Sequence, residues 1–194
     1  MESSPDSRNM HISQDGRGQP NPHSFKELAG RGAWAATYWS IYRWIPRHLN
    51  WWHRSILRVF GAKVGRAVTV YPSAHITCPW NLILKDYCVI GPGVELFALG
   101  TITIGKHSVL SQRAHLCAGT HDYTDPRMPL LRLPIRIGDG AWICAEVFIG
   151  PGVNVGDRSV VGARSVVIKD LPPDSVCAGN PCRTIRPRVM RTGQ

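Results

Sequence analysis

A strict six-residue repeat of aliphatic residues constrains the fold of this chain more than any other feature. Between residues 137 and 167, every sixth position holds a large aliphatic residue: Ile137, Ile143, Ile149, Val155, Val161 and Val167. A helix repeats every 3.6 residues and a strand every two, so neither produces this period over such a length. The spacing predicts an all-β solenoid of short strands and tight corners, in which each side directs one aliphatic side chain to the axis.

The same step of six recurs upstream in three shorter runs separated by two small insertions. These runs are Val64, Val70 and Ile76; Leu84, Ile90 and Leu96; and Ile104, Leu110 and Leu116. Three sides make one coil of about eighteen residues, which predicts roughly five to six coils. We attribute the corner glycines to backbone dihedrals that a Cβ would penalise. A β-sandwich would instead show two-residue alternation and longer spacing.

Five consecutive runs carry a resemblance to a known family: IGDGAW, ICAEVF, IGPGVN, VGDRSV and VGARSV. They resemble the hexapeptide-repeat acyltransferases, and the run LCAGTHDYTDPRMPL is similar to the O-acetyltransferases of colanic acid and exopolysaccharide biosynthesis. The resemblance implies a left-handed parallel β-helix with an N-terminal helical appendage. Left-handed crossovers go against the usual preference, so the handedness rests on the resemblance alone. It also implies a homotrimer with sites between neighbouring subunits, and acetyl-CoA as co-substrate.

Composition divides the chain into four segments. Residues 1–23 are polar and contain several Pro and Gly residues, which predicts a disordered tail. Residues 24–58 predict an amphipathic helical cap, and residues 59–182 hold the repeat. Residues 183–194 form a basic C-terminal segment.

The formal net charge of +10 lies at the two ends of the chain, and the repeat between them is nearly neutral. No helix-turn-helix, zinc-finger or RNP-like run accompanies this charge, so we expect no nucleic-acid partner. No apolar run reaches the roughly 18 residues of a membrane-spanning helix, and the first residues lack a secretory signal. We therefore expect a cytoplasmic protein. The six cysteines show no CxxC spacing and are expected to be buried thiols.

One long excursion interrupts the repeat, because 21 steps instead of six separate Leu116 from Ile137. Loops of this length in compact folds are usually functional, and we expect residues 117–136 to leave the coil. His121 is the candidate general base, since imidazole suits proton transfer at neutral pH. The resemblance also places the family's catalytic histidine here. Asp122 is a candidate for orienting the imidazole, contacting the acceptor or structuring the loop.

The remaining donor-side residues come from the resemblance. It implies that the backbone N–H of Ala145 holds the oxyanion, and that Ala163 and Ile168 offer backbone contacts to the coenzyme. Trp142 is a candidate wall for the pantetheine arm, with ordinary surface packing as the alternative. Lys169, Arg183 and Arg186 would meet the coenzyme phosphates, which agrees with the chemistry of ammonium and guanidinium groups.

The residue expected to contact the acceptor differs from that of the family. Maltose and galactoside acetyltransferases carry an Asn about thirty residues before the catalytic His, and that position is Gly91 here. Glu95 is a candidate replacement as a substrate contact, and a solvated corner residue is the equal alternative. The departure argues against a simple free sugar as substrate.

Residues 28–63 combine aromatic residues with six basic residues and no acid. The pattern predicts two short amphipathic helices broken near Pro46. Such helices could cap the open first coil of the solenoid, and they could also make peripheral contact with the inner face of the membrane.

These observations favour an acetyl-CoA-dependent O-acetyltransferase that acts on a saccharide hydroxyl, free or lipid-linked, in exopolysaccharide or cell-surface glycan biosynthesis. One alternative is a metal enzyme of the γ-carbonic-anhydrase type, for which His107, His115 and His121 would have to converge on zinc. The other is a non-catalytic β-helix scaffold. We expect no metal.

Overall fold

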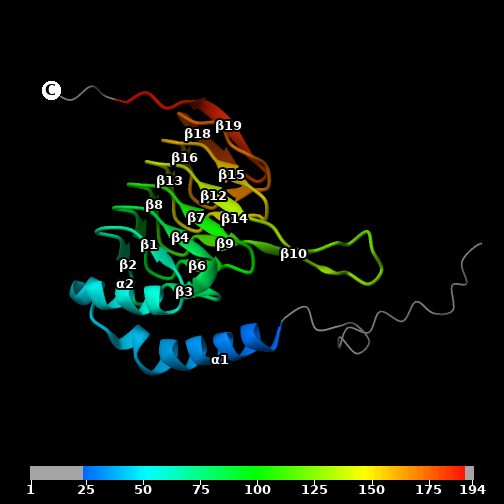
Figure 1. Cartoon of the computed structure of the whole chain (residues 1–194). Helices are drawn as coiled ribbons and strands as arrows, with labels where there is room; N and C mark the ends of the chain where they lie inside the picture. Colours follow the sequence, from blue (N-terminus) through cyan, green and yellow to red (C-terminus); the bar gives the residue numbers. More distant parts are fainter. Residues whose placement is uncertain (1–23, 191–194) are drawn as a thin grey trace, which may run out of the picture.

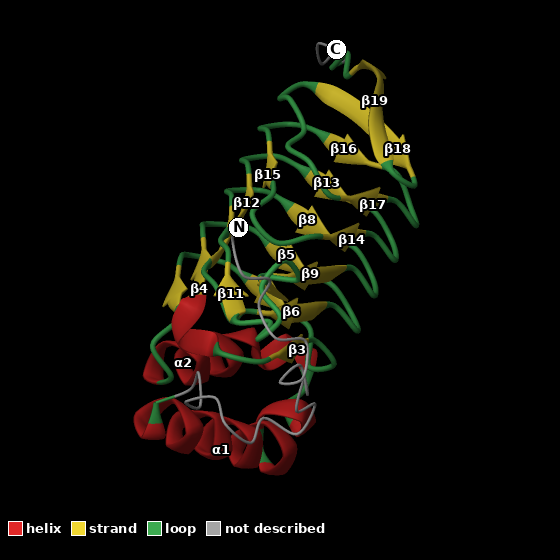
Figure 2. Ribbon diagram, turned by 90° about the vertical axis from the view of Figure 1, so that its right-hand side faces the viewer, coloured by secondary structure: helices red, strands yellow, loops and turns green. Residues whose placement is uncertain are grey.

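A computed structural model describes residues 24–190; the expected tail 1–23 and residues 191–194 lie outside it. The described chain forms a three-sided parallel β-helix with two helices at its N-terminal end (Figure 1). Five complete coils and a partial sixth stack along one axis, as Figure 2 shows. The solenoid, its number of coils and the helical appendage are as the sequence predicted.

Each side of the prism is one sheet. The first face contains β1 (Lys63–Val64), β4 (Leu82–Leu84), β7 (Ile102–Ile104), β12 (Ile135–Ile137) and β15 (Asn154–Val155). The second contains β2 (Thr69–Val70), β5 (Val89–Ile90), β8 (Val109–Leu110), β13 (Trp142–Ile143), β16 (Val160–Val161), β18 (Ser175–Gly179) and the antiparallel β19 (Cys182–Pro187). The third contains β3 (His75–Ile76), β6 (Glu95–Phe97), β9 (His115–Cys117), β14 (Phe148–Ile149) and β17 (Val166–Val167).

The repeat residues stack in register along each face. On the second face Val70, Ile90, Leu110, Ile143 and Val161 pair successively, and each is fully buried. Each coil therefore extends one continuous apolar column and leaves the alternate side chains outside.

The two small insertions occur at the corner between the third and first faces. The earlier one forms a short 3-10 helix, η4 (Pro79–Asn81). The Asn81 amide donates to the carbonyls of Ala98 and Leu99 in the later one, at 2.8 and 3.0 Å. One side chain thus ties the two insertions together.

The corner glycines confirm our sequence interpretation only in part: some have a positive φ, for example Gly140 with φ 65°, but others do not need one. At Gly138 a Cβ would lie 2.4 Å from Oδ1 of Asp157 and 2.6 Å from its backbone nitrogen, so glycine is needed for close approach of the next coil. The left-handed corner positions are mostly filled by other residues, for example Tyr87 with φ 61° and Arg158 with φ 55°. Contact between coils, rather than dihedral freedom, explains Gly138.

The long excursion is a β-hairpin and is shorter than the predicted loop 117–136. Its strands, β10 (Gly119–His121) and β11 (Leu130–Arg132), pair antiparallel, and they project from the prism in Figure 1. Cys117 still belongs to β9, and residues 135 and 136 belong to β12. The strand pairing satisfies backbone groups that a plain loop would leave to water.

The N-terminal helices cover the first coil. They are α1 (Phe25–Ser40) and α2 (Asn50–Val59), joined by the 3-10 helices η2 (Tyr42–Trp44) and η3 (Arg47–Leu49). The Arg54 guanidinium donates to the Val68 carbonyl at 3.2 Å, and the Asn50 side-chain oxygen accepts from the Val70 N–H at 3.0 Å. These contacts satisfy backbone groups of the first coil that have no coil beneath them. None of the described helices has the length and apolar character to span a membrane.

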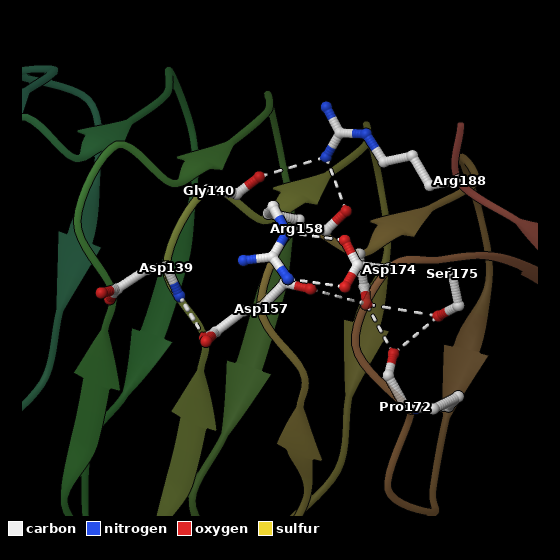
Figure 3. Close-up of polar contacts among 9 residues, drawn as sticks. Asp139, Gly140, Asp157, Arg158, Pro172, Asp174, Ser175 and Arg188 are labelled. Atoms are coloured by element: carbon white, nitrogen blue, oxygen red, sulfur yellow. Dashed lines mark hydrogen bonds and ion pairs between the residues drawn. The ribbon is translucent and has the colours of Figure 1, made fainter. Parts of the chain in front are cut away.

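The basic C-terminal segment begins inside the structure, because residues 183–187 belong to β19. Beyond that strand, Arg188 donates to the carbonyls of Gly140 and Arg158 at 3.2 and 2.7 Å (Figure 3). Arg158 in turn makes a two-point ion pair with Asp174. The end of the described chain is thereby fastened to the fourth and fifth coils.

All six cysteines are free thiols. Cys78, Cys88, Cys177 and Cys182 are buried, as predicted, whereas Cys117 and Cys144 are half-buried. Burial raises the pKa of the Cys88 thiol to about 12, so it stays protonated at neutral pH.

Candidate active site

His121 stands at the end of β10 with its ring exposed. Its Nδ1 lies 2.6 Å from the carbonyl oxygen of Met128, on the returning side of the hairpin. A carbonyl can only accept, so Nδ1 carries the proton in the neutral ring and Nε2 keeps its lone pair. The hairpin thus fixes both the ring and the tautomer that a general base needs.

Asp122 stabilises the hairpin turn. Its Oδ1 accepts from both the N–H and the hydroxyl of Thr124, at 2.9 and 2.6 Å, and these donors hold the pKa of the carboxyl below its usual value. The Asp122 N–H donates to the Pro129 carbonyl across the hairpin. Of the roles expected for Asp122, these contacts support loop structure.

An open groove of about 630 Å³ lies between the hairpin and the upper coils. We call it the upper groove. Its lining is Thr120, His121, Asp122, Tyr123, Thr124 and Leu131 from the hairpin, with Gly150, Pro151 and Ile168 from the coils. Three predicted site residues, His121, Asp122 and Ile168, therefore share one groove, and the exposed Lys169 directly follows Ile168.

The other donor-side residues lie at a different edge of the prism. Ala145 and Ala163 sit one coil apart at the corner between the second and third faces, before β14 and β17. Neither N–H makes a hydrogen bond to any residue between 24 and 190, so both amides can donate. Trp142 is on the second face, where its indole N–H donates to the Ser111 hydroxyl at 2.9 Å.

Arg183 and Arg186 lie on β19, at the C-terminal edge of the second face, and both are exposed. One strand of the third face separates Ala145 from Pro151 in the upper groove. The predicted catalytic and donor-side residues thus lie in three places: His121, Ile168 and Lys169 follow the third face, Ala145 and Ala163 precede it, and Trp142, Arg183 and Arg186 lie on the second face.

A second groove, of about 520 Å³, lies below the hairpin on the third face, and we call it the lower groove. Its lining is Arg31, His75, Thr77, Glu95, Phe97, His115 and Cys117. Glu95 is part of it, with Oε2 3.7 Å from Nδ1 of His115. Glu95 therefore lies in a different groove from His121.

Our sequence reasoning missed His75 as a neighbour of Glu95 and considered His115 only as a zinc ligand. The three residues are spaced by twenty, the coil length in this part of the chain, and they pair in register on β3, β6 and β9. That spacing was the signal that could have found them.

The three histidines of the metal alternative do not come together. His107 stacks on Tyr87 at a corner, with ring centroids 4.8 Å apart, whereas His115 lies on the third face and His121 on the hairpin. Within residues 24–190 no group of three His, Cys, Asp or Glu side chains could hold a metal ion.

Comparisons with known proteins agree with this architecture. Residues 134–169 match the family model "Bacterial transferase hexapeptide (six repeats)". A protein of Escherichia coli strain K12, described as a colanic acid biosynthesis acetyltransferase (WcaF), is 48% identical over 156 residues, which are 80% of this chain and 86% of the relative. The galactoside O-acetyltransferase of the same strain is 33% identical over 135 residues, 68% of this chain and 66% of the relative.

Among solved structures, a hexapeptide-repeat acetyltransferase of Vibrio cholerae O1 biovar eltor in complex with acetyl coenzyme A superposes with a TM-score of 0.79. It is 26% identical, and the match covers 89% of this chain and 94% of that one. The chain belongs to the hexapeptide-repeat acetyltransferase family, and it is an acetyltransferase.

Proposed function

We propose that this acetyltransferase transfers the acetyl group of acetyl-CoA to a saccharide hydroxyl in exopolysaccharide or cell-surface glycan biosynthesis. The observation that carries the proposal is the imidazole of His121, which lines the upper groove with Nδ1 held by the Met128 carbonyl and with no hydrogen bond from Nε2 to any residue between 24 and 190. The relatives described as colanic acid biosynthesis and galactoside O-acetyltransferases support a saccharide acceptor.

The chemistry follows from that tautomer. Nε2 of His121 takes the hydroxyl proton while the hydroxyl oxygen attacks the thioester carbon. The new C–O bond forms, the C–S bond breaks, and the imidazolium returns the proton to the departing thiolate. A thioester is already activated, so no Ser or Cys nucleophile is needed.

The Ala145 N–H is the proposed oxyanion donor, because it is unengaged within residues 24–190. Lys169, Arg183 and Arg186 are the proposed phosphate contacts, since all three are exposed cations. The Ala145 edge and the His121 edge lie across the third face from each other, so we propose that a neighbouring copy supplies the second half of each site.

The lower groove is the proposed place for a saccharide unit of the acceptor. The Glu95 carboxylate accepts sugar hydroxyls, the His75 and His115 imidazoles can donate or accept, and Phe97 offers an apolar ring. Cys117 of this groove and Thr120 of the upper groove are three residues apart, about 10 Å of extended chain. An acceptor of more than one sugar unit fits this separation.

We further propose that the enzyme contacts the membrane surface peripherally, through residues 28–63, where a lipid-linked acceptor would be presented. The absence of acidic residues from this segment supports the proposal.

The direct test of the general base is turnover of His121→Asn. We expect acetyl transfer from acetyl-CoA to an oligosaccharide panel, followed by thiol release and by mass spectrometry of the ester, to fall by about 10²–10⁴-fold. His107→Asn is the matched control, because His107 is remote from both grooves and its φ of 56° is one that Asn tolerates. Unchanged turnover in His121→Asn, or no acetyl ester with any saccharide, would overturn the proposal.

The oxyanion donor has an equally specific test. The corner position of Ala145 holds Pro72 and Pro92 in the first two coils, so Ala145→Pro suits the fold and removes only the N–H. We expect turnover to fall by about 10²–10³-fold. Gln112→Pro, at the same corner one coil lower, should retain wild-type turnover. Equal rates for both variants would exclude the Ala145 amide.

A further inference from the structure

The strongest unassigned surface lies on the N-terminal cap. Five large apolar side chains are exposed between residues 39 and 52, around the connection from α1 to α2. They are Trp39 (58% exposed), Ile41 (55%), Trp44 (73%), Trp51 (49%) and Trp52 (45%), and we call them the aromatic face. Figures 1 and 2 show that the two helices form the N-terminal end of the molecule, opposite the terminal hairpin of β18 and β19.

The aromatic face is not required to bury the first coil. Other rings do that: Trp34, Tyr38 and Tyr42 are buried, and the Trp34 indole N–H donates to the Ile76 carbonyl at 2.5 Å. Two of the exposed tryptophans are linked by a hydrogen bond, since the Trp44 indole N–H donates to the Trp39 carbonyl at 2.9 Å. Trp51 stacks on Trp52 with centroids 4.4 Å apart. An exposed cluster of this kind marks an interaction site.

The charge around the aromatic face identifies its partner. The Arg43 guanidinium lies over the Trp39 ring, 5.0 Å from its centroid, and Arg47 lies over Tyr71 at 4.6 Å. Residues 28–63 contain six basic side chains and no acidic one. Indole rings favour the headgroup level of a bilayer, and nearby arginines favour anionic lipid.

We propose that the aromatic face docks the enzyme onto an anionic lipid membrane. In this orientation the cap faces the bilayer and the solenoid axis points away from it. Trp39 and Arg31 are eight residues apart on α1, which corresponds to about 12 Å along the helix. Because Arg31 lines the lower groove, docking brings that groove near the headgroups. Docking deepens the peripheral membrane contact of the proposed function and does not depend on the acyl-transfer chemistry, whereas presentation of a lipid-linked saccharide there does.

Vesicle co-sedimentation tests the docking with the full-length protein. We expect binding to vesicles of phosphatidylcholine with phosphatidylglycerol, weaker binding to phosphatidylcholine alone, and a decline with added salt. Arg43→Ala with Arg47→Ala should weaken binding roughly 25-fold, since each basic residue contributes about fivefold. Trp44→Ala with Trp51→Ala should weaken it by about tenfold or more.

Trp142→Ala is the matched control, because Trp142 is 48% exposed but lies on the second face of the prism. It should bind vesicles as the wild type does. The proposal is overturned if anionic vesicles are not bound, if the Trp142 control loses as much affinity as the cap variants, or if the cap variants change the oligomeric state instead of vesicle binding. Loss of docking with intact acetyl transfer to a free oligosaccharide would separate this inference from the proposed function.

Discussion

Replacement of Gly138 by alanine tests whether the backbones of two adjacent coils lie too close at this corner to admit a Cβ. The new Cβ would lie 2.4 Å from Oδ1 of Asp157, 2.6 Å from its nitrogen and 2.7 Å from the Gly156 carbonyl carbon. Two of these three atoms are backbone, so relief requires that one corner lift away from the next. That movement would stretch the bond from Gly138 N–H to the Val155 carbonyl and the bond from Asp139 N–H to Asp157, both 2.8 Å long.

The magnitude follows from these contacts. Overpacking costs about 1–3 kcal/mol, and weakening two hydrogen bonds adds about 1 kcal/mol or more. The lower chain entropy of unfolded alanine offsets about 0.4–1 kcal/mol. We expect Gly138→Ala to lower the free energy of unfolding by about 1–4 kcal/mol, which lowers the melting temperature by roughly 2–15 °C at fixed protein concentration.

Gly32→Ala supplies a control of opposite sign. Gly32 lies within α1, and a Cβ there would meet no atom within 4 Å. Alanine favours helix, so this variant should gain up to about 1 kcal/mol. Both variants are compared with the wild type by thermal unfolding followed by circular dichroism. A Gly138→Ala protein that melts at or above the wild-type temperature would refute the close-approach explanation of the corner glycine.

Three further changes probe the cap and the C-terminal fastening. Trp34→Phe leaves the Ile76 carbonyl without its buried donor, and urea unfolding should show a loss of about 1–3 kcal/mol. Burial lowers the pKa of His53 below 6.5, so the unfolded state binds the proton more tightly. Wild-type stability should therefore fall as the pH drops below about 6.5, and His53→Phe should reduce this loss in unfolding titrations. Arg188→Ala removes two hydrogen bonds to carbonyls, and hydrogen exchange should be faster in β19 while the lower coils are unchanged.

The strands of the coils could be predicted from the sequence, because the packing of the coils directly imposes the six-residue repeat. Each sixth residue must point to the axis, so Leu84, Ile90 and Leu96 give the register of a whole coil. The hairpin could not be predicted in the same way. Its strands pair only with each other, and the apolar Leu131 is 37% exposed, so no burial pattern distinguishes them from a loop. The position of Arg188 likewise depends on carbonyls that lie far from it in sequence.

The candidate site, too, could be predicted from the sequence only in part. His121 could be selected from the sequence, because it lies in the excursion and imidazole fits the chemistry. Its partner, the Met128 carbonyl, could not, because the contact exists only once the hairpin has formed. Glu95 was selected without its neighbours, since the twenty-residue spacing of His75 and His115 becomes informative only when the coil length of that region is known.

The proposed general base and the proposed oxyanion donor lie at different edges of the prism, and this separation limits which assemblies can support the proposed chemistry. His121 leaves the prism at the edge that follows the third face, and the free amide of Ala145 lies at the edge that precedes it. A two-fold dimer places the same patch of both copies in contact, so that patch would have to contain both edges of the third face. A head-to-tail contact joins one edge of each copy to the other edge of the next copy, and a set of such contacts closes as a ring where the rotation between copies permits it. The homotrimer that the resemblance to the family implies would be such a ring, in which each hairpin would meet the Ala145 edge of the neighbouring copy. Co-expressed His121→Asn and Ala145→Pro chains should then regain part of the wild-type turnover, because mixed rings contain interfaces in which both groups are intact.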